Sequence, residues 1–404
     1  MKTEAPPRSA YPWYLASSSL WMAGMSLQGF LFTWLLVGIL ERPASEAGLA
    51  RSLAEFPPLI VLLLGGVLGD RINGRSYLMV MHLCMSLPPL LIAMVFKLGL
   101  LSYWWVVLFG VLMASIQSLS DPARQAVLTR VTRIDVQRAI TIMTISTSLV
   151  GLLGFYIGGQ LENLGLGVVL LIQSSLFFAG LFAAQRLPHL PVATPTKRPS
   201  FAVGLKAVWR LKLIRNIVGL NFLSSLFNAG AYIIVIPYIV KDVYLGDAAL
   251  FATVMIVFTI GSIGSNVVLL AFMPLAHPGR LFLVLQLTRI IILIWVWMQP
   301  SLWLFLLALV AWGTNMGITT TLVRTTVQEL APQAERAQIL SILLLSFMVS
   351  SPISAILLGF LIEGTSPLTG LIPGMAMSLL IFAIGSWKSG LWQYRSEPSI
   401  LDRA

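Results

Sequence analysis

Hydrophobic runs of about 20 residues recur along the whole chain and are separated by short polar segments. A helix needs roughly 20 apolar residues to cross the hydrocarbon core of a bilayer, so each run predicts one transmembrane helix. We identify twelve such spans: 14–40, 46–69, 77–98, 101–120, 138–161, 165–185, 217–240, 248–272, 280–299, 301–322, 338–361 and 368–388. The pattern predicts an all-α polytopic membrane protein.

The composition supports this interpretation. Only 10% of the residues are charged, against roughly 25% in ordinary globular proteins. The mean hydropathy of +0.89 favours hydrocarbon over water. The first apolar run is too long for the hydrophobic region of a cleavable signal peptide, so we expect it to stay as a helix. Cys84 is the single cysteine, which excludes a disulfide framework.

The basic residues predict the orientation. If both termini are cytoplasmic, 21 of the 26 Lys and Arg residues lie in the inner loops and tails, as the positive-inside rule requires. This asymmetry supports an even number of crossings. It also accounts for the net charge of +11 without a nucleic-acid partner. We expect the chain to lie in the bacterial inner membrane.

One long polar stretch, residues 186–216, divides the spans six and six. It is rich in proline at first and then basic and amphipathic, which predicts a linker with a short helix on the cytoplasmic membrane surface. The expected domains are therefore an N-terminal six-helix bundle (1–185), the linker, and a C-terminal six-helix bundle (217–404).

The two halves share short sequence matches in the same order. "SLWMAG" (19–24) parallels "SLFNAG" (225–230), and "ARQAV" (123–127) matches "VRTTV" (323–327) 200 residues later. These matches indicate duplication of a six-helix unit and hence two pseudo-symmetric bundles. Such repeats place a substrate site at their interface and let the halves rock about it.

The segment "GGVLGDRINGRS" (65–76) connects spans two and three. It resembles the signature of the major facilitator superfamily of secondary transporters, roughly G-x-x-x-D-R-x-G-R-[RK]. The matching positions are Gly66, Asp70, Arg71 and Arg75, whereas Asn73 and Gly74 replace the glycine and the first arginine of the signature. Asparagine tolerates a left-handed turn better than other non-glycine residues, so we expect Asn73 to replace the glycine in such a turn.

The resemblance implies a cytoplasmic latch. In the family, the signature aspartate faces the start of helix eleven, and a signature basic residue pairs with an acid near helix four. The corresponding residues here are Asp70, Arg71 and Asp121, the last of which we expect to end helix four. A simple positive-inside turn is the alternative, and it explains Arg75 but not Asp70.

Two further stretches carry the resemblance. "SDPARQAVLTRV" (120–131) is similar to the segment after helix four in exporters related to the enterobactin exporter and the macrolide-efflux group, which implies efflux. Spans five and eight contain glycines that imply a helix-packing switch between the halves, with general membrane-helix packing as the alternative. These glycines are Gly151, Gly154, Gly158, Gly159, Gly261 and Gly264.

The family resemblance also implies a substrate cavity lined by helices one, four, seven and ten. Each of these spans carries an amide, accompanied by aromatic residues and methionine. The candidates are Trp21, Met25, Gln28, Gln117, Asn221, Asn228, Tyr232, Trp312, Asn315 and Met316. A mainly apolar pocket with a few polar groups suits an amphipathic ligand. Interhelical hydrogen bonding or packing is the alternative for each residue.

Two charged residues lie within spans. Glu55 is a candidate proton carrier, since acids within the membrane tend to be functional. A local ion pair with Arg51, four residues earlier, is an equally good interpretation. Arg289 in span nine either binds an anionic substrate group or, as we favour, snorkels to the headgroups or pairs locally.

Enzymatic and metal-binding signatures are missing from the sequence. It has no H-E-x-x-H, G-x-S-x-G or Walker A motif, and we expect no catalytic residue, metal or cofactor. His82 and Cys84 point apart at i, i+2 on a helix, which favours packing over metal binding. The sequence thus predicts a monomeric secondary transporter in contact with membrane lipids, exporting a hydrophobic or amphipathic molecule by proton antiport. The alternatives are an uncoupled lipid or metabolite carrier and a transporter-like membrane sensor.

Overall fold

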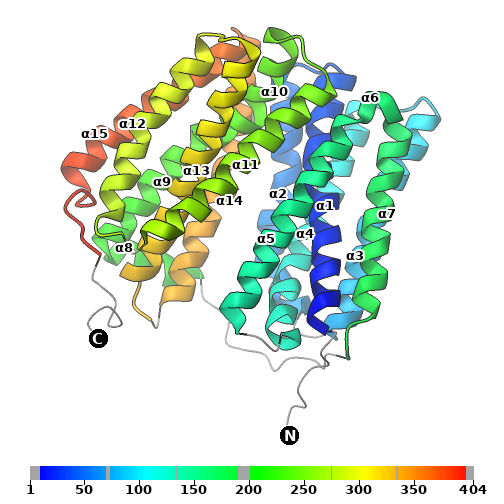
Figure 1. The fold of residues 1–404 in the computed structure, drawn as a ribbon, viewed down its shortest axis with the longest axis horizontal. Helices are drawn as coiled ribbons and strands as arrows, with labels where there is room; N and C mark the ends of the chain where they lie inside the picture. The colour runs from blue at the N-terminus through cyan, green and yellow to red at the C-terminus, as the bar shows by residue number, and fades with distance from the viewer. Residues whose placement is uncertain are drawn as a thin grey trace, which may run out of the picture. The chain divides into compact units, whose positions relative to one another are not determined.

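The computed structural model describes residues 10–69, 73–132, 135–189, 201–273, 275–333 and 335–396. Residues 61–69, 136–137 and 201 are described by their backbone alone. All the regular structure within these ranges is helical (Figure 1). The predicted all-α fold class is confirmed.

The α-helices of the first half are α1 (Ala10–Trp34), α2 (Ala44–Gly69), α3 (Gly74–Lys97), α4 (Tyr103–Val131), α5 (Val136–Gly159), α6 (Leu161–Leu164) and α7 (Leu166–Gln185). Those of the second half are α8 (Phe201–Arg210), α9 (Lys212–Gly230), α10 (Ile236–Tyr238), α11 (Ala248–Phe272), α12 (Pro278–Trp297), α13 (Leu302–Leu330), α14 (Arg336–Glu363) and α15 (Ile372–Lys388). Three π-helical segments, η1 (Leu35–Ile39), η2 (Ala231–Val235) and η3 (Ile239–Val243), and the 3₁₀ helix η4 (Pro367–Leu371) complete the series.

Eleven helical segments among the described residues are long and apolar enough to cross a membrane. The remaining predicted span, 46–69, coincides with α2. Helices α4 and α13 continue past the predicted ends of their spans, and α9 begins at Lys212, inside the predicted linker. Hydropathy locates only the part of a helix that lies in hydrocarbon, whereas the backbone hydrogen bonds continue beyond it.

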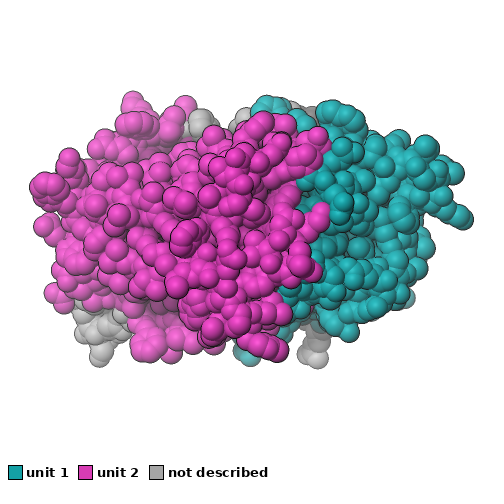
Figure 2. Space-filling model, turned by 90° about the horizontal axis from the view of Figure 1, so that it is seen from above, with its two compact units in different colours: residues 1–42, 50–196, 246–253 teal, residues 43–49, 197–245, 254–404 magenta. Residues whose placement is uncertain are grey.

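The chain divides into two compact units, coloured separately in Figure 2. Unit 1 comprises residues 1–42, 50–196 and 246–253, and unit 2 comprises residues 43–49, 197–245 and 254–404. The main division falls inside the predicted linker. Each unit also takes a short segment from the other half of the sequence, namely the start of α2 in unit 2 and the start of α11 in unit 1.

Close backbone packing and hydrogen bonds hold these two exchanged segments. In unit 2, Gly48 of α2 packs against the backbone of Ala355, and the Ser45 amide donates to Glu363 Oε2 at 3.0 Å. In unit 1, the Ala248 amide at the start of α11 donates to a carboxylate oxygen of α6 at 3.3 Å.

Helix α3 shows how the burial pattern suits a membrane. Its exposed face carries apolar side chains at alternating spacings of three and four, which are Val80, Leu83, Leu87, Leu90 and Met94. The opposite face is buried and includes His82 and Ser86. A long apolar exposed face is stable against lipid, and the polar residues in the middle of this helix, His82 and Ser86, are buried.

Helix α8 lies within the segment predicted as a linker. Its Gly204 lies against the backbone of Gln338 on α14, with the carbonyl oxygen 2.8 Å from where a Cβ would stand. Arg210 at its end forms an ion pair of 2.7 Å with Glu335. Trp209 remains 63% exposed, so the helix keeps an apolar side chain available to a membrane surface.

Candidate functional site

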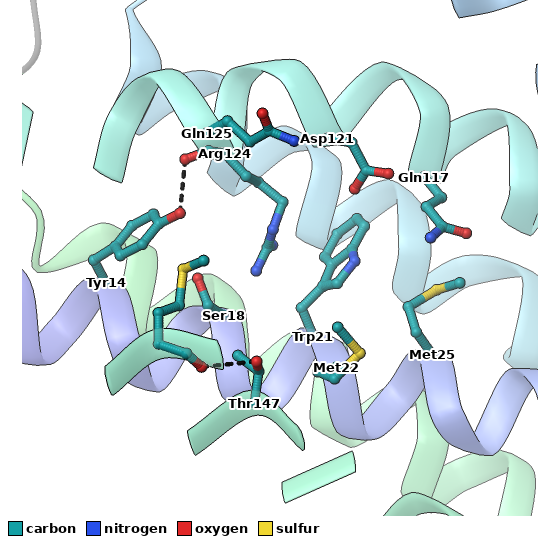
Figure 3. A pocket seen from close by; sticks show the side chains of 11 residues that line it. Tyr14, Ser18, Trp21, Met22, Met25, Gln117, Asp121, Arg124, Gln125 and Thr147 are labelled. Atoms are coloured by element: carbon teal, nitrogen blue, oxygen red, sulfur yellow. Dashed lines mark hydrogen bonds between the residues drawn. The ribbon is translucent and has the colours of Figure 1, made fainter. Parts of the chain in front are cut away.

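A cavity of about 300 Å³ lies in unit 1, lined by α1, α4 and α5 (Figure 3). Its lining residues repeat at spacings of three and four, which places them on one face of each helix. They are Tyr14, Ser18, Trp21, Met22 and Met25 of α1, Gln117, Asp121, Arg124 and Gln125 of α4, and Met143 and Thr147 of α5. The volume falls at the lower end of the range for small-molecule sites.

The apolar part of the lining is unusually adaptable. Three methionines, Met22, Met25 and Met143, contribute unbranched side chains that fit ligands of varied shape. Trp21 adds a large aromatic surface. The polar groups come mainly from α4. The cavity therefore combines an apolar wall with a polar one, an arrangement that suits an amphipathic molecule.

Arg124 is the most unusual residue of the cavity. It is 9% exposed, and its guanidinium carbon lies 4.6 Å from the centre of the Trp21 ring. Nη1 is buried and has no hydrogen-bond partner in the described part of the chain. None of the ion pairs among the described residues involves Arg124. Figure 3 shows the side chain extending from α4 toward α1, between Ser18 and Trp21.

Neighbouring side chains hold Trp21 and Arg124 in place. The Trp21 ring makes edge contacts with His82, at 5.1 Å between centroids, and with Phe177, at 5.6 Å. His82 Nδ1 lies 3.1 Å from the Phe177 carbonyl and so donates to it, which leaves Nε2 to accept from the Ser17 hydroxyl at 2.8 Å. His82 is thus occupied in packing, as the sequence suggested. The Tyr14 hydroxyl donates to the Arg124 carbonyl at 2.6 Å.

Asp121 lines the same cavity one turn before Arg124, and its side chain is exposed. The expectation that it ends helix four is wrong, because α4 continues to Val131. Pro122, the next residue, cannot donate a helical hydrogen bond. The helix nevertheless continues through it, and this continuation places Arg124 on the cavity face.

Only part of the predicted cavity set comes together here. Trp21, Met25 and Gln117 line the cavity as expected. Gln28 does not, because it is buried and accepts a hydrogen bond of 2.9 Å from Gln173 of α7. Arg124 was not among the residues expected in the cavity, because its charge was attributed to membrane topology alone. Arg124 follows Gln117 by seven residues, and residues at this spacing lie on the same face of a continuous helix. This spacing was the signal in the sequence that placed Arg124 beside the predicted cavity residue.

Arg289 of α12 occupies a different environment in unit 2. It is 3% exposed, so it does not snorkel, and local pairing is the part of the favoured interpretation that holds. Its guanidinium donates to four side-chain oxygens: Asn315 Oδ1 at 2.9 Å, Ser224 Oγ at 2.6 Å, Thr319 Oγ1 at 3.2 Å and Gln286 Oε1 at 3.4 Å. These partners come from α9, α12 and α13. Because they satisfy the buried charge locally, the side chain has no need to reach the headgroups.

The other predicted cavity residues of unit 2 lie in packed surroundings. Tyr232 stacks on Phe258 at 3.9 Å between centroids, and Trp312 meets Tyr232 edge-on at 6.4 Å. Asn221 and Asn228 are buried, each with one amide atom lacking a hydrogen-bond partner. Met316 is half-buried on α13. None of these residues lines the cavity of unit 1.

Comparison with known proteins identifies the family. The family model described as "Major Facilitator Superfamily" matches residues 14–355. The chain belongs to the major facilitator superfamily. It is accordingly a membrane transporter rather than an enzyme. None of the curated proteins searched matches it.

Solved structures of other transporters share the fold at low sequence identity. The nucleoside transporter NupG has a TM-score of 0.74 at 14% identity, covering 96% of this chain and 98% of that one. A bacterial homologue of the human lysosomal transporter Spinster has a TM-score of 0.70 at 15% identity, with coverages of 97% and 100%. The POT family transporter PepTSo has a TM-score of 0.70 at 14% identity, with coverages of 95% and 98%. These likenesses establish the fold alone.

The superfamily signature is only partly within the described residues. Asp70 and Arg71 lie outside them, and Gly66 is in the described backbone of α2. Asn73 does not adopt the expected left-handed turn, since its φ is −55°. Instead its Oδ1 accepts from the Arg75 amide at 3.0 Å and caps α3, which begins at Gly74. Asparagine is favoured at this position because it satisfies a free amide of the first turn.

The predicted glycines mainly pack helices within one unit. On α5, Gly154 lies against the backbone of Ala23 and Leu27 on α1, and Gly151 and Gly158 also face α1. Gly159 meets Ala252 at the start of α11.

On α11, Gly261 lies against the backbone of α13 at Val310 and Thr314. A Cβ on Gly264 would meet nothing within 4 Å among the described residues. These contacts on both helices favour the packing interpretation, and a role in switching remains a prediction.

Glu55 forms an ion pair with Arg51, with 2.6 Å between Oε1 and Nε. This contact was one of the two interpretations of Glu55, and proton transfer by this residue remains a prediction. Within the described residues, no group of three or more His, Cys, Asp or Glu side chains could hold a metal ion.

Proposed function

We propose that this protein exports a hydrophobic or amphipathic small molecule across the bacterial inner membrane by alternating access. The observation that carries the proposal is the cavity of unit 1, in which Trp21 and three methionines oppose the polar face of α4. A mainly apolar site with a few placed polar groups is typical of small-molecule recognition. The low polarity of this wall argues against a sugar or another strongly hydrated substrate.

Alternating access is supported by the duplicated organisation of the chain. The short sequence repeats of the two halves are matched by π-helical segments, η1 following α1 and η3 ending the corresponding helix of the second half. Widened turns of this kind are frequent at functional sites. Transporters built from repeats move substrate by rocking one repeat against the other.

The direction of transport and the topology rest on the sequence. Export follows from the resemblance of residues 120–131 to the corresponding segment of the enterobactin and macrolide exporters. Cytoplasmic termini follow from the distribution of Lys and Arg. Asp70 and Arg71 would then form the cytoplasmic latch, and Asp70→Asn should impair transport while leaving the protein in the membrane. Full activity of this variant would contradict the latch.

Proton coupling is the expected energy source, and two carboxylates of the described chain are suited to a test. Glu55 is paired with Arg51, whereas Asp121 is exposed and lines the cavity. The engagement of Glu55 also favours a second candidate function, an uncoupled carrier of lipids or metabolites. Comparing Glu55→Gln and Asp121→Asn for their dependence on a pH gradient separates these two functions.

The deciding experiment measures flux in proteoliposomes that contain the purified protein. Substrates are first found by screening amphipathic toxic compounds in cells lacking the gene, with and without the gene restored. Export driven by an imposed pH gradient supports the proposal. Flux that is insensitive to the gradient supports the uncoupled carrier, and binding without flux under any gradient indicates a sensor instead.

A further inference from the structure

The cavity of unit 1 contains a buried positive charge that forms no ion pair within the described chain. Arg124 is more than nine-tenths buried, and its Nη1 has no hydrogen-bond partner among the residues that the structure describes. Burying a cation without a paired counter-charge costs free energy, and one unpaired N–H adds to that cost. A side chain kept in such a state, and facing a cavity, is poised to receive an anion.

The surroundings of Arg124 hold its position without pairing its charge. Trp21 offers its aromatic face at 4.6 Å, a contact that stabilises a cation but leaves its N–H groups free. The Tyr14 hydroxyl fixes the backbone of Arg124 through its carbonyl at 2.6 Å. His82 and Phe177 hold the Trp21 ring at its edges. A guanidinium ordered in advance loses little conformational entropy when a ligand binds.

The other ionisable groups near the cavity leave the guanidinium without a bonded partner. Asp121, one turn away on the same helix, attracts it through space but is exposed and forms no ion pair with it. His82 is held by Ser17 and Phe177 on the far side of Trp21 and carries no negative charge. The phenol of Tyr14 donates its proton to a carbonyl.

A second hydrogen-bond donor stands beside the guanidinium. The Ser18 hydroxyl lines the same cavity and is buried, with the Tyr14 phenol as a polar neighbour. Figure 3 shows Ser18 of α1 close to the end of the Arg124 side chain. A carboxylate accepts several hydrogen bonds at once, and guanidinium groups match its geometry.

We propose that Arg124 binds the anionic group of the transported molecule and that the substrate is an amphipathic organic carboxylate. The carboxylate would accept hydrogen bonds from Arg124 and Ser18, and its apolar body would lie against Trp21 and the cavity methionines. This inference rests on the proposed function, which supplies the amphipathic substrate, and adds the charge that the site selects.

The test compares aromatic carboxylates with their neutral amides. Purified protein is titrated calorimetrically with 2-naphthoate, 4-phenylbenzoate and indole-3-acetate and with the three corresponding amides. The variants are Arg124→Gln, Arg124→Lys and, as a matched control, Arg138→Gln, which removes an exposed arginine of α5 outside the cavity. Thermal unfolding of each variant establishes that it is folded.

The wild type and Arg138→Gln should bind at least one acid about tenfold or more tightly than its amide, the effect of a charge-assisted hydrogen bond. In Arg124→Gln this preference should fall below about twofold while amide binding is unchanged. Arg124→Lys should retain part of the preference, because it keeps the charge. Equal binding of acid and amide by the wild type, an unaltered preference in Arg124→Gln, or binding of no acid overturns the proposal.

Flux measured separately distinguishes this inference from the proposed function. If the acid preference depends on Arg124 but the bound acid is not transported in proteoliposomes, anion recognition stands and export fails. If the wild type and Arg124→Gln transport neutral amphipathic compounds equally and neither prefers acids, export stands and anion recognition fails.

Discussion

Two arginines are buried in the described part of this transporter, one in each unit, and they differ in how their charge is satisfied. Arg289 donates to four side-chain oxygens drawn from three helices. Arg124 stacks on Trp21 and leaves Nη1 without a partner beside a cavity. Burial alone therefore does not separate a structural charge from a ligand-binding one. The two also differ in their hydrogen-bond partners, and an unpaired buried donor lowers stability unless a partner is supplied.

The comparison predicts opposite effects on stability, and this is the largest expected difference. Arg289→Met should lower the free energy of unfolding by at least about 3 kcal/mol, because four buried oxygens lose their donor at roughly 1–3 kcal/mol each before relaxation. Arg124→Met should leave stability unchanged or raise it, because it removes a buried charge that lacks an ion pair.

Thermal unfolding of both variants in the same detergent gives the answer. A larger loss of stability for Arg124→Met than for Arg289→Met would reverse the assignment of the two roles.

Asn315 links Arg289 to a neighbouring helix, since its Oδ1 accepts a hydrogen bond from Arg289 and its amide nitrogen donates to the Leu285 carbonyl at 2.8 Å. Asn315→Ala should destabilise the protein by about 1–3 kcal/mol, the cost of leaving buried partners unpaired. Asn163→Ala serves as the control, because its amide bonds to Gln160 on an exposed surface. A loss of stability no larger than that of the control would mean that the Arg289 network is not structural.

Trp21 should affect ligand binding more than folding. Trp21→Leu removes the aromatic face under Arg124, which is worth about 0.5–2 kcal/mol, so the affinity for an aromatic carboxylate should fall roughly 2- to 30-fold. Trp104→Leu, at a side chain that is 68% exposed, is the matched control. Titration calorimetry measures both variants. Unchanged affinity of Trp21→Leu for the acid would show that Trp21 does not contribute to the binding site.

Asp121 should produce the smallest effect. Asp121→Asn removes a negative charge one turn from Arg124 and should tighten binding of the carboxylate about two- to fivefold, because water screens the exposed Asp121 carboxylate. Glu41→Gln removes an exposed acid outside the cavity and is the control. Weaker binding in Asp121→Asn would show that Asp121 assists the ligand rather than competing with it.

The sequence predicted where the helices lie better than it predicted where they end or which face of each helix is buried. Twelve apolar runs correspond to helices, because crossing a bilayer imposes a local requirement on composition. Helix four was expected to end at Asp121, but it continues through Pro122 to Val131. A single residue that weakens a helix does not decide its end when tertiary contacts, such as the bond from Tyr14 to α4, support the next turns.

The candidate site was only partly predictable, as Gln28 and Gln117 show. Both are amides in apolar spans, and sequence analysis assigned both to the cavity. Gln28 bonds to Gln173 of another helix, and Gln117 lines the cavity. In a helix that is apolar all round, the sequence carries little information about which face turns inward.

Local hydropathy specifies the membrane class, the succession of apolar helices and the short helix of the linker, because each of these depends on neighbouring residues of the chain. Which buried polar groups meet one another, and which remain unpaired, depends on how each helix is rotated in the folded protein. Contacts between distant segments, such as Gly154 against α1, set that rotation. Two arginines in similar apolar surroundings therefore became a structural centre in one unit and an unpaired charge beside a cavity in the other.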